Sequence, residues 1–65
     1  MKLVVNGEDR ATAVATLADL VRELALEGKP IAVELNRAVV PKDRYAQTRL
    51  GDGDRLEIVT LVGGG

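Results

Sequence analysis

The sequence contains no cysteine and no histidine among its 65 residues. The chain therefore cannot supply a thiolate nucleophile, an imidazole general base or the usual ligands of zinc. Tryptophan and phenylalanine are also absent, and Tyr45 is the only aromatic residue, so bases of nucleic acids find no stacking platform. We expect a protein that is not itself an enzyme and that binds no metal ion or cofactor.

Charge of either sign is not in excess. Nine Lys and Arg residues and ten Asp and Glu residues give a formal net charge of -1, without a basic block that could follow a phosphate backbone. No apolar run is long enough for a signal peptide or a membrane span, and there is no disulfide framework typical of exported proteins. We expect no nucleic acid or membrane partner, and a cytoplasmic location.

The size and composition predict one small globular domain. Apolar residues make up 46% of the sequence and charged residues 29%, which is typical of a folded chain. A chain this short buries only about 60% of the surface that its unfolded form exposes. We expect a single domain over residues 1–65, of modest stability, with a flexible tail at Gly63–Gly65.

The N-terminal residues predict a β-hairpin. Alternating residues over Met1–Val5 end at Asn6-Gly7, a strong turn signal. A second, less apolar segment over Glu8–Val14 is expected to return as an edge strand. A single glycine with no helix directly after it is a turn far more often than a phosphate-binding loop.

A helix is predicted next. Thr16-Leu17-Ala18-Asp19 has the form of a capping box, with a hydroxyl at the N-cap and an acid three residues later. Gly28, as a left-handed cap, and Pro30 are expected to end the helix. Its apolar stripe should cover a sheet rather than bind a partner. The stripe consists of Leu17, Leu20, Val21, Leu24 and Ala25.

Two further strands follow. Ile31–Leu35 alternates, Asn36-Arg37 is a turn, and Ala38–Val40 is a short strand that Pro41 ends.

The segment Lys42–Tyr45 after Pro41 predicts a helical turn or a loop. The Tyr45 ring is expected to pack in the core rather than to bind a ligand. Gly51–Asp54 resembles part of a calcium loop, but only Asp52 and Asp54 are close enough to act as ligands. We therefore interpret Gly51–Asp54 as a turn.

The last strand, Arg55–Val62, divides its apolar residues between two faces. Leu56 and Ile58 should point toward the helix, whereas Val59 and Leu61 should point away from it. Exposed apolar side chains beside the chain end indicate a docking surface, although single exposed apolar residues are also ordinary in folded proteins. The candidate partner-docking residues are Val59, Leu61 and Val4.

The sequence ends in Val62-Gly63-Gly64-Gly65. Three terminal glycines would occur by composition roughly once in a few thousand chains, taking glycine at about 7% per position. Glycine has no Cβ, so this segment can lie extended in a channel too narrow for other residues. Two interpretations are open at this point: a carboxylate delivered to another protein's active site, or an unused terminus.

The order strand, strand, helix, strand, short strand, strand and glycine tail resembles the ubiquitin-like β-grasp fold. Within it, the whole chain is similar to the bacterial sulfur carriers of thiamine biosynthesis. The residues that carry this resemblance are Asn36, Val39-Val40-Pro41-Lys42, Tyr45, Asp52-Gly53-Asp54, Leu56-Glu57-Ile58 and Val62-Gly63-Gly64-Gly65. It implies an α+β fold with a mixed sheet of about five strands and one helix on one face.

The resemblance also implies a role as a cosubstrate. An adenylyltransferase similar to ubiquitin-activating enzymes would use ATP and magnesium to adenylate the Gly65 carboxylate. Sulfur drawn from cysteine would convert the Gly65 carboxylate to a thiocarboxylate. Thiazole synthase would then accept the sulfur. Val62, Gly63 and Gly64 would thread into the partner's active site.

Three alternatives remain open in the sequence. A molybdopterin-synthase carrier shares the glycine terminus. A β-grasp interaction module would use the face with Val59 and Leu61 and not the tail. A protein-conjugating modifier would form isopeptide bonds through the tail. The absence of other reactive groups favours a working Gly65 carboxylate.

Overall fold

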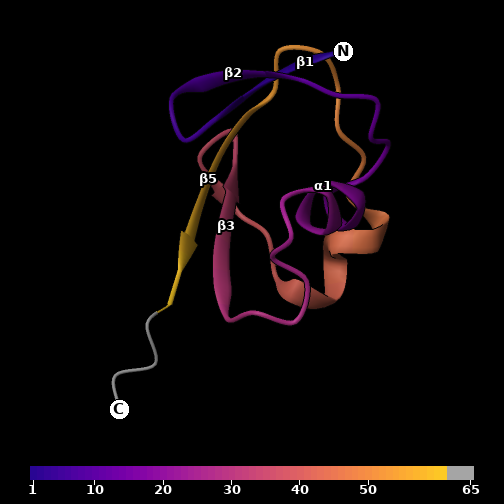
Figure 1. Cartoon of the computed structure of the whole chain (residues 1–65). Coiled ribbons are helices and arrows are strands. Elements are labelled where there is room, and N and C mark those ends of the chain that lie inside the picture. Colours follow the sequence, from indigo (N-terminus) through magenta and orange to yellow (C-terminus); the bar gives the residue numbers. More distant parts are fainter. Residues whose placement is uncertain (62–65) are drawn as a thin grey trace.

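Residues 1–61 form a mixed five-stranded sheet with one α-helix across one face (Figure 1). The computed structural model describes residues 1–61, so the predicted tail residues Val62, Gly63, Gly64 and Gly65 lie outside the described residues. The strands lie in the order β2-β1-β5-β3-β4. The elements are β1 (Lys2–Val5), β2 (Glu8–Ala11), α1 (Leu17–Glu23), β3 (Ile31–Leu35), β4 (Ala38–Val39), the 3-10 helix η1 (Lys42–Gln47) and β5 (Arg55–Thr60).

The first hairpin confirms the predicted turn. Asn6 and Gly7 have φ values of 52° and 82°, the positive values that a two-residue turn between twisted strands requires. β2 is the edge strand, as predicted, but it ends at Ala11 and not at Val14. Thr12 still pairs with Met1 through the backbone, since its N–H donates to the Met1 carbonyl at 2.9 Å, and the chain leaves the sheet after it.

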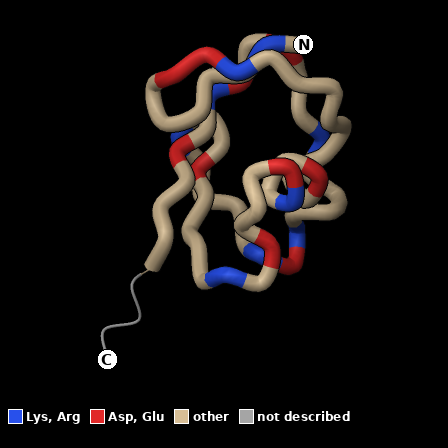
Figure 2. Tube along the Cα trace, viewed as in Figure 1, with Lys and Arg blue, Asp and Glu red and all other residues tan. Residues whose placement is uncertain are grey.

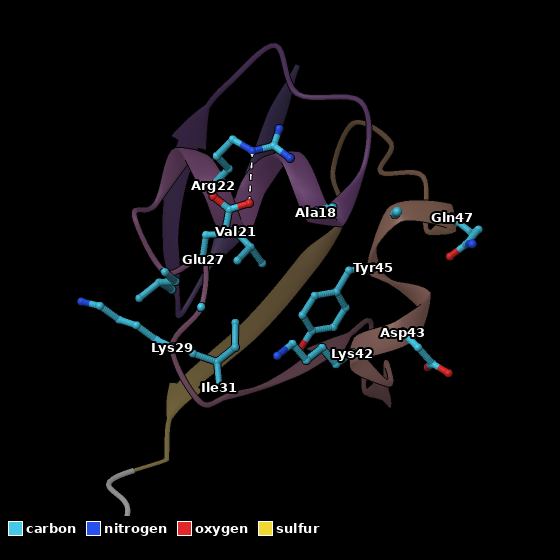
Figure 3. A pocket seen from close by; sticks show the side chains of 13 residues that line it. Ala18, Val21, Arg22, Glu27, Lys29, Ile31, Lys42, Asp43, Tyr45 and Gln47 are labelled. Atoms are coloured by element: carbon cyan, nitrogen blue, oxygen red, sulfur yellow. Dashed lines mark ion pairs between the residues drawn. The ribbon is translucent and has the colours of Figure 1, made fainter.

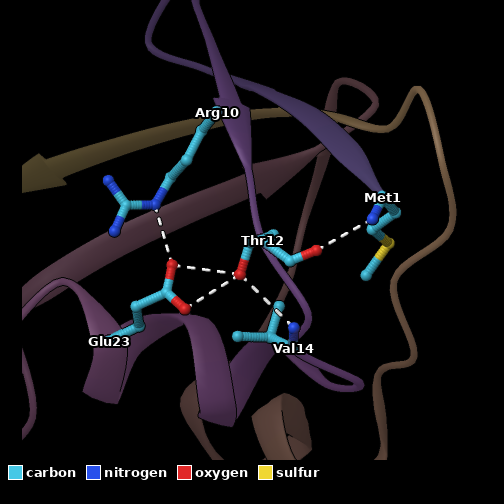
Figure 4. Close-up of polar contacts among 5 residues, drawn as sticks. All are labelled: Met1, Arg10, Thr12, Val14 and Glu23. Carbon is cyan, nitrogen blue, oxygen red and sulfur yellow. Dashed lines mark hydrogen bonds and ion pairs between the residues drawn. The ribbon is translucent and has the colours of Figure 1, made fainter.

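Thr12 joins the N-terminus to the end of the helix (Figure 4). Its hydroxyl donates to the Glu23 carboxylate, 2.9 Å from Oε1 and 3.0 Å from Oε2, and Arg10 Nε donates to the same carboxylate at 2.9 Å. The Met1 ammonium donates to the Thr12 carbonyl at 2.9 Å. These bonds hold the chain over α1 and fix the helix against the β1–β2 hairpin.

The capping box at the start of α1 is confirmed. The Asp19 N–H donates to the Thr16 hydroxyl at 3.2 Å, and the Thr16 N–H donates back to the Asp19 carboxylate at 3.3 Å. The backbone hydrogen bond from Thr16 and the further bonds around the carboxylate lower the pKa of Asp19. A charged acid is therefore favoured near the positive end of the helix dipole.

The predicted end of the helix at Gly28 is wrong. α1 ends at Glu23, and Ala25 adopts a left-handed conformation with φ 59°. The Leu26 N–H donates to the Val21 carbonyl at 2.9 Å, the bond that defines a Schellman cap. Ala25 is exposed instead of part of the apolar stripe, and Leu26 packs against the core after the reversal. Gly28 also has positive φ, but in the following turn.

β5 is the central strand, parallel to β1 and antiparallel to β3. Two asparagine side chains hold it. The Asn6 amide donates to the Ile58 carbonyl at 3.0 Å and accepts from the Ile58 N–H at 2.7 Å, which extends the pairing of β1 beyond its last residue. In the second turn, the Asn36 side chain accepts from the Arg55 N–H at 3.0 Å. Asn36 and Arg37 both have positive φ, which confirms the second turn.

The remaining elements agree with the sequence prediction to within two residues. Tyr45 is buried in the core, which confirms packing, and its burial raises the pKa of the phenol. Asp52 accepts from the Lys2 N–H and Asp54 from the Gly51 N–H, both at 2.7 Å, which confirms the turn at Gly51–Asp54. The buried core consists of Leu3, Leu17, Leu20, Val21, Val33, Tyr45, Leu56 and Ile58.

Candidate docking face

The two faces of the sheet differ sharply along β5. Leu56 and Ile58 are buried against α1, whereas Val59 and Leu61 are 54% and 50% exposed on the opposite face. This confirms the predicted division of the strand into a covered and an open face. The Leu61 N–H donates to the Pro30 carbonyl at 2.8 Å. Leu61, at the end of the described residues, is therefore still paired with the residue directly before β3.

The open face does not bring the three predicted docking residues together. Val59 lies opposite Ala32 of β3, and Leu61 follows two positions later, directly after the end of β5. Val4 shares this face but lies opposite Arg55 and is half-buried. Glu57 separates Val4 from Val59 along β5, so the apolar patch near the tail consists of Ala32, Val59 and Leu61.

The structure adds residues to the open face that the sequence prediction missed. Val39, 72% exposed, lies opposite Glu34, and Glu34 lies opposite Glu57 on β5. Figure 2 shows the acidic segments of β3 and β5 side by side. Each strand alternates clearly in the sequence, but the register that pairs Glu34 with Glu57 is long-range information. Only the pairing of β3 with β5 reveals it.

A hollow of about 240 Å³ lies at this acidic pair. Its walls are Glu34, Glu57, Arg37 and Arg55. Within residues 1–61, none of these four side chains takes part in an ion pair. Their charges are therefore available to another molecule.

A second hollow, of about 260 Å³, lies between α1 and η1 on the covered side of the molecule (Figure 3). Val21, Ile31 and Tyr45 line it, and an ion pair of 3.6 Å between Arg22 and Glu27 lies at its rim. Its volume is below the range of about 300–1,000 Å³ typical of small-molecule sites. Its apolar wall belongs to the core, so we assign it no ligand.

No group of three or more Asp or Glu residues within residues 1–61 is arranged to hold a metal ion. No helix in this part of the chain is long and apolar enough to cross a bilayer. Asp52 and Asp54 already accept backbone hydrogen bonds, as the turn requires.

Comparison with known proteins decides the family. The family model described as ThiS family matches residues 3–65. The chain belongs to the ThiS family. A curated relative from Bacillus subtilis, named sulfur carrier protein ThiS, is 40% identical over 97% of this chain and 98% of its own length. A crystal structure of a thiamine biosynthesis protein (ThiS) from Geobacter metallireducens covers 100% of both chains with 30% identity and a TM-score of 0.84. The predicted ubiquitin-like β-grasp fold is thereby confirmed.

Two further relatives are much longer than this chain. The thiazole synthase of Paramagnetospirillum magneticum is 50% identical over 100% of this chain, but the matched segment is only 20% of that protein. The thiazole synthase of Magnetococcus marinus is 39% identical, again over 20% of its length. The chain thus spans about a fifth of the length of each of these two relatives, both of which are named thiazole synthase.

Proposed function

We propose that this protein is a sulfur carrier of thiamine biosynthesis that holds the sulfur as a thiocarboxylate on Gly65. The observation that carries the proposal is the ThiS family match, which extends to Gly65 and so includes the glycines of the tail. The full-length similarity to the Bacillus subtilis sulfur carrier supports it. The names of the relatives favour thiamine over molybdopterin synthesis.

The chemistry needs only the carboxylate from this chain. A carboxylate is a poor electrophile, and its conversion to an acyl-adenylate with release of pyrophosphate makes the carbonyl carbon reactive. A sulfur nucleophile, counted as hydrosulfide, then forms a C–S bond while the bond to the phosphate-bearing oxygen breaks. AMP and a proton leave, and the product is the thiocarboxylate.

We assign two partner enzymes to this cycle. An adenylyltransferase, with ATP and magnesium, performs the activation, and a sulfur-donor system supplied from cysteine provides the sulfur. Thiazole synthase accepts the sulfur as the C–S bond at Gly65 breaks, and a new C–O bond, formed with water or with the oxygen that the sulfur displaces from its acceptor, regenerates the carboxylate. Two relatives that are named thiazole synthase and contain a segment similar to this chain support this assignment. Val62, Gly63 and Gly64 thread into the active site of the partner enzyme. The docking face carries Val59, Leu61 and Val4. We place this cycle in the cytoplasm.

Intact-mass measurement tests the activation. After incubation with the activating enzyme, ATP, magnesium and a sulfur donor, the protein should gain the mass difference between one sulfur and one oxygen atom. A variant extended by one residue after Gly65 should not gain it. An unchanged wild-type mass, while the same enzyme modifies a known ThiS protein, contradicts the proposal.

A further inference from the structure

The open face carries its side chains in bands that run across the strands. Nearest the tail are the apolar residues Val59 and Ala32, which lie opposite each other. One step further from the tail, Glu57 lies opposite Glu34. One step further again on β5 is Arg55. Since alternate residues of a strand share a face, successive bands on β5 lie about 7 Å apart.

Arg37 completes the basic band. It follows Asn36, whose N–H donates to the Arg55 carbonyl at 2.7 Å, and it lines the same hollow as Arg55, Glu34 and Glu57. The hollow has two carboxylates and two guanidinium groups. These charges are segregated, with the acids on the side of the tail and the bases on the side away from it.

This arrangement works against the stability of the isolated sheet. Like charges directly opposite on two strands are destabilising, whereas one acid and one base opposite each other would stabilise the pair. Exchanging Glu57 and Arg55 along β5 would place a base opposite Glu34. Local violations of sheet chemistry are typical of functional surfaces.

We propose that these bands orient the docking of thiazole synthase through complementary charges. The docked orientation in turn sets the direction and depth at which the tail enters the active site of that enzyme. The proposal rests on the proposed function. The partner surface should present an apolar patch nearest its active-site entrance, then a basic side chain, then an acidic one. Val39, exposed beside Glu34, extends the contact toward β4.

The apolar band ends at Leu61, the residue directly before the tail in the sequence, so an enzyme that receives the tail comes close to this face. Two such enzymes are proposed, and one observation favours thiazole synthase over the adenylyltransferase as the occupant. In two relatives that are named thiazole synthase, a segment similar to the whole of this chain is part of the same polypeptide. Complementary charge bands orient partners and reject wrong alignments, because juxtaposed like charges cost several kcal/mol.

A band-inverted variant tests the proposal without changing composition. Glu34→Arg, Glu57→Arg, Arg37→Glu and Arg55→Glu together keep the formal net charge at -1 and exchange the two charged bands. We expect this full-length variant to bind the thiazole synthase of the same organism at least about tenfold more weakly than wild type. The difference should shrink as salt concentration rises, since salt screens exposed charges. Calorimetric titration measures the affinity, and thermal unfolding verifies the fold.

A second variant covers the case in which the inverted protein does not fold. Arg55→Glu with Glu57→Arg exchanges the bands on β5 alone, and we expect it to weaken binding in the same direction. Binding within twofold of wild type by a folded variant overturns the inference and leaves the proposed function intact. The inference is also overturned if a variant binds thiazole synthase as wild type does but loses its adenylation by the activating enzyme or its association with a second copy of this chain. The charged bands would then serve that other partner. Failure of wild type to bind or to donate sulfur instead contradicts the proposed function.

Discussion

The two faces of one sheet follow opposite rules in this protein. On the covered face, alternate residues of β1, β3 and β5 meet α1 and form an apolar core. On the open face, the intervening residues expose Val39, Val59 and Leu61 and set Glu34 opposite Glu57. The covered face stabilises the fold, whereas the open face places two like charges opposite each other, which is unfavourable in the isolated chain. Stability and docking are thus separated by the two-residue alternation of a strand.

The largest expected difference between the faces lies within β5. Leu56 is 1% exposed, so Leu56→Ala should lower the free energy of unfolding by about 2 to 5 kcal/mol through lost burial and a cavity. Val59→Ala, on the open face, should lower it by less than about 0.5 kcal/mol, yet weaken thiazole synthase binding. Urea unfolding and titration measure the two quantities. Equal destabilisation by both changes would contradict the separation of the faces.

The helix that covers the core offers a smaller test. Ala25 follows the helix cap with φ 59°, a conformation that costs a residue with a Cβ about 1 to 2 kcal/mol and that glycine adopts freely. Ala25→Gly should therefore raise the free energy of unfolding, by up to about 1 kcal/mol. Ala18→Gly, inside α1, is the matched control and should lower it by about 1 kcal/mol. If both glycines destabilise the protein, the left-handed cap at Ala25 is wrong.

The smallest expected effect is the dependence of stability on pH. The Thr12 hydroxyl and then Arg10 donate to Glu23 and lower its pKa below the ordinary value of 4.5. A carboxylate with a lowered pKa in the folded state stabilises the protein fully above pH 4.5, and this contribution is lost as the pH falls through the folded-state pKa.

Two variants isolate this contribution. Glu23→Gln should destabilise the protein above pH 4.5, and its difference from wild type should shrink in more acidic solution. Thr12→Val removes the main donor, keeps the side-chain shape and should raise the pKa of Glu23. Thermal unfolding at a series of pH values measures the first effect, and carboxyl NMR titration the second. A difference from wild type that grows on acidification would show that Glu23 acts otherwise.

The sequence predicted those parts of the fold that depend on local patterns. The Asn6-Gly7 turn, the capping box at Thr16 and the alternation of β5 are each determined within a few residues, and all three are confirmed. The helix end was mispredicted because Gly28 and Pro30 are the usual stop signals. The left-handed residue is instead Ala25, three residues before Gly28, and Leu26 after it packs on the core.

The candidate site was predicted only in part, for a related reason. The exposure of Val59 and Leu61 follows from alternation within one strand, which local sequence contains. The pairing of Glu34 with Glu57 and the separation of Val4 from Val59 depend on register between strands distant in sequence. Register is set by the whole sheet, so a single strand cannot reveal which charges become neighbours.

Sulfur transfer from Gly65 is the central claim, and one measurement tests it most directly. The thiocarboxylate protein, freed of its activating enzyme, is incubated with thiazole synthase and the other substrates of that enzyme, and its intact mass is followed with time. The account predicts that the mass returns to that of the carboxylate form as thiazole accumulates in equal amount. Thiazole formation with the sulfur still on Gly65, or loss of sulfur without the synthase at the same rate, would contradict it.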